Sequence, residues 1–293
     1  MKVSYVEAGA GIGKDFRGNA KDSQALLVGE DDAPDNYRLG FSRQQGPFYS
    51  PRHKHNFDQI RMVFGGGAMN YGPDQWIQPG ELVYFPEGTP YGPQDYESER
   101  YGVTFQFGGA SGQGYISIKR MREGVEALKP FGTFEKGVFT RTGDLAPGMK
   151  RNRDSYEAVW EHINGRPLAY PKPRYSQPIL MKPKNFDWQS VPGQSDLSVK
   201  RLGCFSERQT EIALLRVTAG GRAQIAARPG VQLGVVIEGD GSIADKPLRQ
   251  HAAFSLEANE SGVLTATSDL ELLLVGLPIF QRQTTRQRVQ PAA

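Results

Sequence analysis

Cysteine is almost absent from this sequence, which has one, Cys204, in 293 residues. A lone thiol can form neither an intrachain disulfide nor a thiolate zinc cluster, and we expect Cys204 to be a small buried side chain. Long apolar runs are missing too: no stretch approaches the roughly 18 residues of a membrane span, and residues 1–20 lack the apolar core of a signal peptide. These absences predict a soluble, cytoplasmic protein without a membrane partner.

Charge of one sign is not concentrated anywhere in the chain. The 35 Lys and Arg residues nearly balance the 32 Asp and Glu residues, which leaves a formal net charge of +3. The basic residues are dispersed, whereas a protein that binds nucleic acid usually gathers them in a stripe or patch. Short basic clusters at 150–153 and 282–288 are typical of solvated loops. No nucleic-acid partner is therefore expected.

Glycine and proline are abundant, with 35 and 20 residues scattered without a period. Such residues supply the backbone angles that tight turns need, so the composition is typical of many short strands. Apolar and polar residues alternate between turn signals in two zones, residues 37–108 and 201–278. The sequence predicts an all-β protein with two β domains.

The zones suggest four segments along the chain. These are an N-terminal domain at 1–112, a helical and proline-rich connector at 113–185, a C-terminal domain at 186–281 and a flexible tail at 282–293. Within the connector, helices are expected at 115–128 and 154–163, the second with Asp154 as its N-cap and its end before Gly165. The five prolines of 166–183 indicate an extended strap over the surface.

The first zone contains a cluster of polar residues with a spacing of two. His53 and His55 are followed by Gln59 and Arg61, and residues two apart in a strand point to the same face. If that face is a barrel interior, four polar side chains meet there, which is costly unless they are hydrogen-bonded or bind a metal. Asp58 has the opposite phase and is expected to face away.

A second segment, Gly80 to Tyr91, forms a strand that leads into the turn Pro86-Glu-Gly88. Together the two segments resemble the two motifs of the cupin superfamily. The first motif is His-x-His, then three or four residues, Glu, six residues and Gly; the second is Gly-x5-Pro-x-Gly-x2-His. Both spacings are kept, but Gln59 stands at the Glu position and Tyr91 at the second-motif His position.

The resemblance implies two jelly-roll barrels of the cupin type in one chain, a bicupin of RmlC-like fold. It also implies a divalent transition metal, Fe, Zn, Ni, Mn or Cu, with His53, His55, Gln59 and Tyr91 at the ligand positions. Gln59 offers only a neutral amide oxygen, and Tyr91 a phenol that binds a metal well only when the metal lowers its pKa. The alternative is a histidine pair that lines a polar pocket without metal.

Arg61 lies where this family usually has an apolar residue. Its forked guanidinium suits a clamp for a substrate carboxylate or enolate, and an ion pair with an acid such as Glu81 is the structural alternative. Tyr91 could act as an acid or base beside the metal position. On the strand Val103 to Phe107, the sequence does not decide whether Phe105 and Phe107 or Thr104 and Gln106 face inward.

The second zone superimposes on the first when Gln232 is set against Gln59. Ala226 and Arg228 then occupy the histidine positions, and the fourth ligand position falls near Ser261. The only histidine of this zone, His251, falls near the start of a strand. The second barrel is therefore expected to bind no metal and to serve packing or dimerisation.

The resemblance implies a metal-dependent enzyme, an oxidoreductase of dioxygenase type that acts on a small enolisable or carboxylate-bearing substrate. A cupin isomerase or lyase is possible on the same architecture, because reaction type varies on one fold. A non-catalytic protein that binds a sugar or organic acid is the other alternative. Exposed sheet edges also favour self-association as a homodimer.

Overall fold

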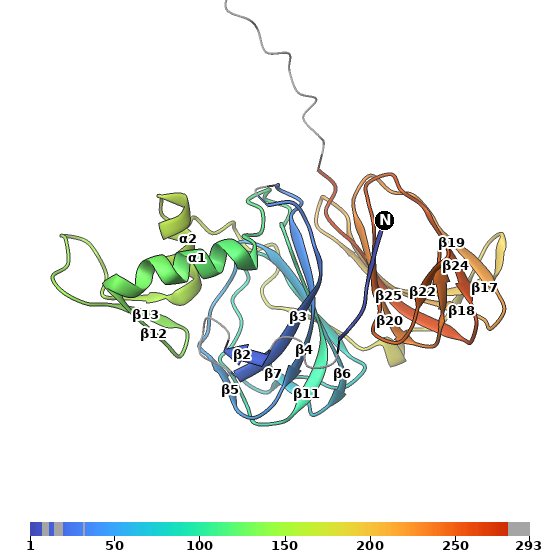
Figure 1. Ribbon diagram of the computed structural model, residues 1–293, viewed down its shortest axis with the longest axis horizontal. Helices are drawn as coiled ribbons and strands as arrows, with labels where there is room; N and C mark the ends of the chain where they lie inside the picture. Colours follow the sequence, from blue (N-terminus) through green and yellow to red (C-terminus); the bar gives the residue numbers. More distant parts are fainter. Residues whose placement is uncertain (8–11, 15–19, 32, 281–293) are drawn as a thin grey trace, which may run out of the picture.

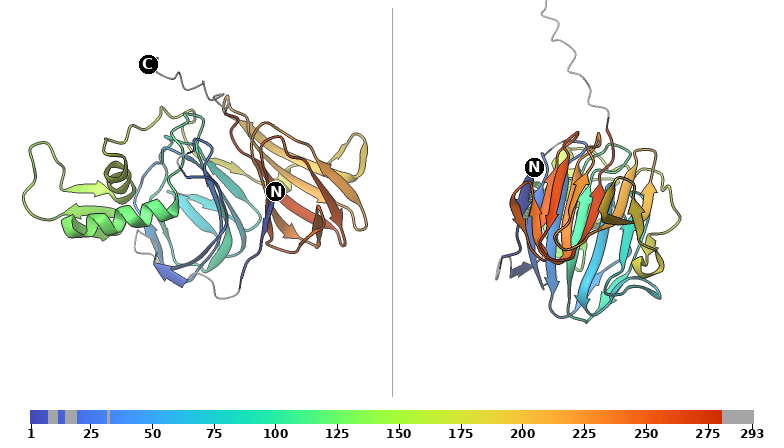
Figure 2. Two further views of the ribbon diagram at one scale, coloured as in Figure 1. Left: turned by 45° about the horizontal axis from the view of Figure 1, so that its top comes forward. Right: turned by 90° about the vertical axis from the view of Figure 1, so that its right-hand side faces the viewer.

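The computed structural model describes residues 1–7, 12–14, 20–31 and 33–280, so the predicted tail at 282–293 lies outside the described residues. Two antiparallel β barrels lie side by side, and a helical insert lies beyond the first barrel on the side away from the second (Figures 1 and 2). The predicted all-β, double-barrel fold is confirmed. Neither helix within the described ranges is long and apolar enough to cross a membrane.

The first barrel is built on a seven-stranded sheet, which forms the floor of the candidate functional site. Its spatial order is β15 (Ile179–Met181), β9 (Leu82–Phe85), β6 (Asp58–Gly66), β11 (Arg100–Phe107), β4 (Tyr37–Gln44), β3 (Ala20–Val28) and β2 (Ile12–Lys14). Two short pairs close the barrel: β5 (Phe48–Ser50) with β10 (Gln94–Tyr96), and β7 (Met69–Gly72) with β8 (Gln75–Ile77).

The second barrel has a seven-stranded and a four-stranded sheet. The first runs β1 (Lys2–Ser4), β23 (Ala253–Leu256), β20 (Gln232–Glu238), β25 (Leu270–Gly276), β18 (Thr210–Val217), β17 (Gln194–Phe205) and β16 (Gln189–Val191). The second runs β19 (Arg222–Ile225), β24 (Gly262–Ala266), β21 (Gly241–Ile243) and β22 (Lys246–Leu248). Cys204 on β17 is exposed, so its predicted burial is wrong; the buried residues of this strand are Leu197, Val199 and Leu202.

Two strands lie in the barrel that is distant from them in sequence. β1 pairs with β23 in the second barrel, with Lys2 opposite Ser255, and β15 from the connector pairs with β9 in the first barrel. The boundaries drawn from the sequence, 1–112 for one domain and 113–185 for the connector, do not follow this exchange. Hydrophobic alternation shows that a segment is a strand but not which sheet it joins.

The insert consists of α1 (Ile118–Leu128), a 3-10 turn at Lys129–Phe131, β12 (Gly132–Glu135), β13 (Val138–Arg141), β14 (Asn152–Asp154) and α2 (Ser155–Asn164). The Asp154 carboxylate accepts hydrogen bonds from the backbone of Tyr156 and Glu157, and Gly165 ends α2 in the left-handed conformation, as predicted. α1 begins at Ile118 instead of residue 115, because the Ser117 hydroxyl caps it by accepting from Arg120 N at 3.2 Å.

The barrels share one apolar core, made from the facing surfaces of their large sheets. Phe105, Phe107 and Ile60 from the first barrel belong to the same buried cluster as Leu233 and Leu273 from the second. The interior of the second barrel is a separate cluster of apolar side chains. There Arg228, at a histidine position of the motif, donates to the backbone carbonyls of Leu277 and Gln209.

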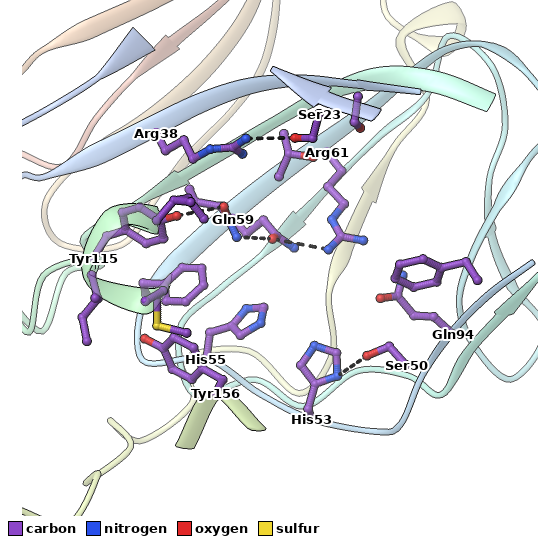
Figure 3. A pocket seen from close by; sticks show the side chains of 18 of the residues that line it. Ser23, Arg38, Ser50, His53, His55, Gln59, Arg61, Gln94, Tyr115 and Tyr156 are labelled. Carbon is purple, nitrogen blue, oxygen red and sulfur yellow. Dashed lines mark hydrogen bonds between the residues drawn. The ribbon is translucent and has the colours of Figure 1, made fainter. Parts of the chain in front are cut away.

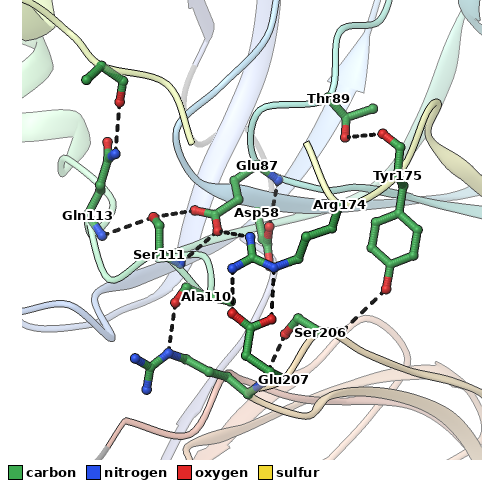
Figure 4. A network of polar contacts seen from close by, with 12 residues as sticks. Asp58, Glu87, Thr89, Ala110, Ser111, Gln113, Arg174, Tyr175, Ser206 and Glu207 are labelled. Carbon is green, nitrogen blue, oxygen red and sulfur yellow. Dashed lines mark hydrogen bonds and ion pairs between the residues drawn. The ribbon is translucent and has the colours of Figure 1, made fainter. Parts of the chain in front are cut away.

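The proline-rich strap joins the barrels through Arg174 (Figure 4). Its guanidinium forms ion pairs with Glu87 of the first barrel, at 2.7 Å, and with Glu207 of the second, at 2.5 Å. Glu87 is buried, and its carboxylate also accepts hydrogen bonds from the backbone and hydroxyl of Ser111. A buried carboxylate with this set of partners fixes the strap against both barrels.

Candidate functional site

A cavity of about 1050 Å³ lies inside the first barrel and continues beneath the helical insert. Its barrel wall carries the polar side chains shown in Figure 3, including His53, His55, Gln59 and Arg61. Its outer wall, from the insert, combines the apolar side chains of Met121, Val125 and Phe134 with the charged residues Arg122, Glu126 and Lys129. The cavity can therefore hold a ligand with one polar and one hydrocarbon part.

The histidine segment is held by the turn of the second motif. His53 and Tyr91 form a two-way backbone bridge, with N to O distances of 3.0 and 2.9 Å, and Gly88 N donates to His55 O at 2.7 Å. Directly after the histidines, Asp58 accepts from Glu87 N at 2.8 Å. The two sequence motifs are thus joined along their length, although His53 and His55 precede the regular strand β6.

Two features of this turn require glycine at position 88. Its φ of +77° lies in the left-handed region, and a Cβ there would lie 2.3 Å from the carbonyl oxygen of Pro171 in the strap. Asp58 faces away from the cavity, as predicted, and its second oxygen accepts from the Tyr84 hydroxyl at 2.8 Å. Burial is the main cause that raises the pKa of Asp58 to about 7.

His53 has its ring orientation and tautomer set by its neighbours. Its Nδ1 lies 2.6 Å from the carbonyl oxygen of Pro51, which can only accept, so Nδ1 carries the proton. The lone pair of Nε2 then points into the cavity, where it lies 2.9 Å from the Tyr91 hydroxyl. A backbone carbonyl on the far nitrogen is the usual arrangement for a histidine that binds a metal.

His55 is oriented by aromatic contacts instead. Its ring stacks on Phe57 at 4.3 Å and 8°, and Tyr156 of α2 meets it edge-on at 5.9 Å. Tyr156 also donates to Asn56 at 2.6 Å, so the insert holds the histidine segment directly. The Nε2 atom of His55 lies 3.4 Å from the Tyr91 hydroxyl.

The Tyr91 hydroxyl is the point at which the predicted site residues meet. It lies within 2.9 to 3.4 Å of His53 Nε2, His55 Nε2 and Gln59 Nε2. Two ligands of one ion lie roughly 3.0–3.4 Å apart when each metal bond is about 2.1 Å long. The spacing of the two imidazoles and the phenol oxygen therefore fits three ligands of one transition-metal ion, with the phenol deprotonated.

Gln59 does not fit the ligand role in this orientation. Its Oε1 accepts from Gln106 at 3.1 Å and from Arg61 at 3.5 Å, so its amide nitrogen is the atom that faces Tyr91. A flipped amide would turn its NH₂ group toward Arg61, whose guanidinium can only donate. Among the described residues no cluster of three or more His, Cys, Asp or Glu side chains could hold a metal.

Arg61 has no acidic partner in the described part of the chain. Glu81, the predicted alternative partner, lies 3.8 Å from Lys182 and accepts from Gln78 N. The Arg61 guanidinium instead contacts Gln59 and the sulfur of Met69, and its buried Nε has no hydrogen-bond partner. The geometry leaves this cation free to bind an anion in the cavity.

The phase of β11 is settled by the structure. Thr104 and Gln106 line the cavity, whereas Phe105 and Phe107 point into the core between the barrels. Aromatic lining comes instead from residues that the sequence analysis did not single out, Tyr115 and Tyr156. Burial raises the pKa of Tyr115 to about 12, so its hydroxyl keeps its proton and donates to Gln106 at 3.1 Å.

Three further arginines in the cavity, Arg38, Arg100 and Arg122, were missed. Arg38 lies in the run Tyr37 to Gln44, where Arg38, Gly40, Ser42 and Gln44 share one phase and the larger apolar residues the other. That alternation was the available signal for a polar inward face. Nothing in the sequence sets Arg100 apart from the other basic residues near strand ends.

Comparison with known proteins shows which solved structures share the fold. No family model and no curated protein sequence matches the chain. A proposed dioxygenase from Nostoc punctiforme has a TM-score of 0.55 at 11% identity, over 95% of this chain and 79% of that one. Salicylate 1,2-dioxygenase from Pseudoaminobacter salicylatoxidans, in adducts with gentisate, has a TM-score of 0.51 at 14% identity, over 87% and 73%.

A third structure, GK1651 from Geobacillus kaustophilus, matches over 96% of both chains, with a TM-score of 0.51 and 12% identity. Likenesses at such identities establish the fold, and each of them extends over both barrels of this chain. The chain therefore has the double-barrel fold of these structures, which is the fold that the resemblance to the cupin motifs predicted.

Proposed function

We propose that the first barrel is the active site of a metal-dependent enzyme that acts on a small organic acid. In this proposal His53, His55 and Tyr91 hold a divalent transition metal, and Arg61 binds a carboxylate or enolate of the substrate. The observation that carries it is the approach of two imidazole nitrogens to one phenol oxygen, at distances typical of ligands that share an ion. The unpaired guanidinium of Arg61 beside them supports the anionic substrate.

A bound ion would supply a Lewis acid that polarises a carbonyl or enolate oxygen of the substrate. The protein's own residues do the rest. Arg61 orients the acid through its fork of donors, and its contact with Gln59 Oε1 holds it at the histidine side of the cavity. The insert covers the outer wall and excludes water from the substrate.

In the alternative state without a bound metal, Tyr91 is positioned to move a proton. Its hydroxyl donates to His53 Nε2, because the Nδ1 of that ring already carries its proton. The pair can therefore pass a proton between the cavity and the imidazole, which is the arrangement required for general acid and base chemistry. An oxidative reaction of the dioxygenase class is the version that we propose, and its support is the fold shared with salicylate 1,2-dioxygenase.

Metal content tests this proposal directly. We expect the purified protein to contain close to one equivalent of a transition metal by elemental analysis, and His53→Ala to lose it. His162→Ala is the matched control, because His162 is exposed on α2 and lies outside the cavity. A metal-free wild-type protein that cannot be loaded with Fe, Zn, Ni, Mn or Cu would refute the metal role.

A second candidate is a non-catalytic protein that binds organic acids in the same cavity. It is favoured by the amide nitrogen of Gln59, which faces Tyr91 where the family motif has a carboxylate. This candidate predicts binding of an acid that depends on Arg61, is unaffected by chelators and leads to no product. The enzyme predicts metal-dependent turnover that His53→Ala abolishes.

A further inference from the structure

Besides Arg122 of α1, three arginines line the cavity, each from a different strand: Arg38 on β4, Arg61 on β6 and Arg100 on β11. None of them forms an ion pair with an Asp or Glu among the described residues. The Nε atom of each is buried and has no hydrogen-bond partner there. Three unneutralised guanidiniums in one cavity are costly, because like charges repel and each has lost solvent.

The partners that these arginines do have are weak ones. Arg38 donates to the Ser23 hydroxyl at 3.0 Å, and Arg100 donates to the Tyr96 hydroxyl. Arg61 contacts an amide oxygen, a sulfur and the ring of Phe85. None of these groups carries a negative charge, so none compensates the cations.

Several arginines outside the cavity have carboxylate or backbone carbonyl partners. Arg174 is paired with two carboxylates, and Arg228 donates to two backbone carbonyls. Arg208 likewise donates to the carbonyls of Ala110 and Ile279. Arg141 and Arg153 outside the cavity also have a buried Nε without a hydrogen-bond partner, but Arg153 pairs with Glu157 and Glu161. The cavity differs in bringing together several arginines that have no acidic partner among the residues that the structure describes.

Strand register brings Arg38 and Arg61 to the same level of the barrel floor. Arg61 lies opposite Thr104 of β11, and Gly40 lies opposite Thr104 on the other side. A Cβ at residue 40 would lie 2.5 Å from Nη1 of Arg38, so the Arg38 side chain extends over Gly40. The two guanidiniums thus flank Thr104, across backbones that two strand spacings, about 10 Å in all, separate.

Burial lowers the pKa of Arg38 and Arg100, against an opposing effect of Tyr115 on the first and of Tyr96 on the second. Burial is the largest cause for each group, and the charge of Arg122 lowers the pKa of Arg38 further, as the charge of Arg61 does that of Arg100. Both groups are thus in a positive, desolvated environment that a multiply charged anion would relieve.

We propose that the cavity binds an organic acid with at least two carboxylates, one at Arg61 beside the histidines and the second at Arg38. Arg100 adds positive charge at the Arg61 end. The inference rests on the proposed function, in that the first carboxylate is the one assigned to Arg61, and it extends that function by naming the substrate class. The apolar side chains of the outer wall, Met121, Val125 and Phe134, accommodate the hydrocarbon body of the acid.

Calorimetric titration of the purified full-length protein, at constant ionic strength, tests the inference with matched acids. Glutarate is compared with pentanoate, and isophthalate with benzoate, so that each pair differs by one carboxylate. We expect at least one diacid to bind at least tenfold more tightly than its monoacid. Arg38→Met is expected to remove that advantage and leave the monoacid unchanged, whereas Arg61→Met weakens both.

Arg216→Met is the control, because this arginine lies in the second barrel, is 44% exposed and pairs with Glu271 at the surface. Arg38→Lys keeps the charge and is expected to retain part of the advantage, which tests Arg38 even if the methionine variant does not fold. We also expect Arg38→Met to unfold at the same temperature as the wild type or higher without ligand, since it removes an uncompensated buried charge.

The outcomes separate this inference from the proposed function. If monoacids bind in an Arg61-dependent manner and diacids gain nothing, the proposed function stands and the diacid inference is overturned. The same holds if Arg38→Met and Arg38→Lys leave the preference for diacids intact. If no acid binds at all, with metal bound through His53, the ligand class of both proposals is refuted and the metal site remains.

Discussion

The substitution Asp58→Asn is expected to change how stability depends on pH. Asp58 is fully buried between Tyr84 and the backbone of Glu87, and both donate to it at 2.8 Å. Its pKa is raised from 3.8 to about 7, first by burial and then, in smaller part, by the charge of Glu87, while the two hydrogen bonds and Arg174 oppose the rise. Asparagine can keep both contacts, since its oxygen accepts from Glu87 N and its NH₂ donates to the Tyr84 oxygen.

The sign follows from the proton balance. Between pH 3.8 and about 7 the folded protein keeps a proton on Asp58 that the unfolded chain releases, so this residue's contribution to stability falls as pH rises through that window. One pKa unit corresponds to about 1.4 kcal/mol, which gives a relative loss of roughly 2–3 kcal/mol for the wild type between pH 5 and 7.5. The Asn variant has no such group, so its unfolding free energy rises relative to that of the wild type by this amount as the pH rises.

Urea unfolding followed by circular dichroism, at half-unit steps from pH 5 to 7.5, measures the difference in unfolding free energy. Glu207→Gln is the control: hydrogen bonds from Arg174 lower the pKa of Glu207 to about 2, below the whole range, so its difference from the wild type should stay flat. A constant difference between Asp58→Asn and the wild type, or one that grows as pH falls, would refute the raised pKa.

Three other substitutions test the site and its supports. Gln59→Glu places an oxygen where the amide nitrogen now faces Tyr91, so metal affinity in a chelator competition should rise at least tenfold. Gly88→Ala should lower unfolding free energy by about 2–4 kcal/mol, and Gly46→Ala, which has a φ of +88° but no atom within 4 Å, by only about 1 kcal/mol. Arg174→Ala should cost about 2–4 kcal/mol by leaving buried Glu87 without its cation, against under about 1 kcal/mol for the surface pair lost in Arg216→Ala; equal losses would contradict the strap's role.

The histidine cluster was predictable because its signal is local. The spacing of His53, His55 and Gln59, and of the turn before Tyr91, depends only on short segments whose pairing the motif fixes. The ends of α2 were also predictable, since Asp154 and Gly165 act on their own neighbours. Local chemistry of this kind is present in the sequence itself.

Features that depend on pairing between distant segments were not predictable. Arg38 meets Arg61 only through the register of β4 and β6 against β11, and the phase of Phe105 is decided by a core that the second barrel completes. Glu81, the predicted partner of Arg61, pairs with Lys182 instead, because the strap brings Lys182 close to it. Long-range contacts choose between alternatives that local patterns leave equal.

The exchange of β1 has a consequence for synthesis of the protein. Lys2–Ser4 is translated well before its partner Ala253–Leu256, because the first barrel and the insert lie between them in sequence. The first barrel can therefore form during translation, whereas the large sheet of the second cannot gain this edge strand until Ala253–Leu256 has been made. A reporter or tag that restrains Lys2–Ser4 would delay closure of the second barrel, far from the restrained residues in sequence.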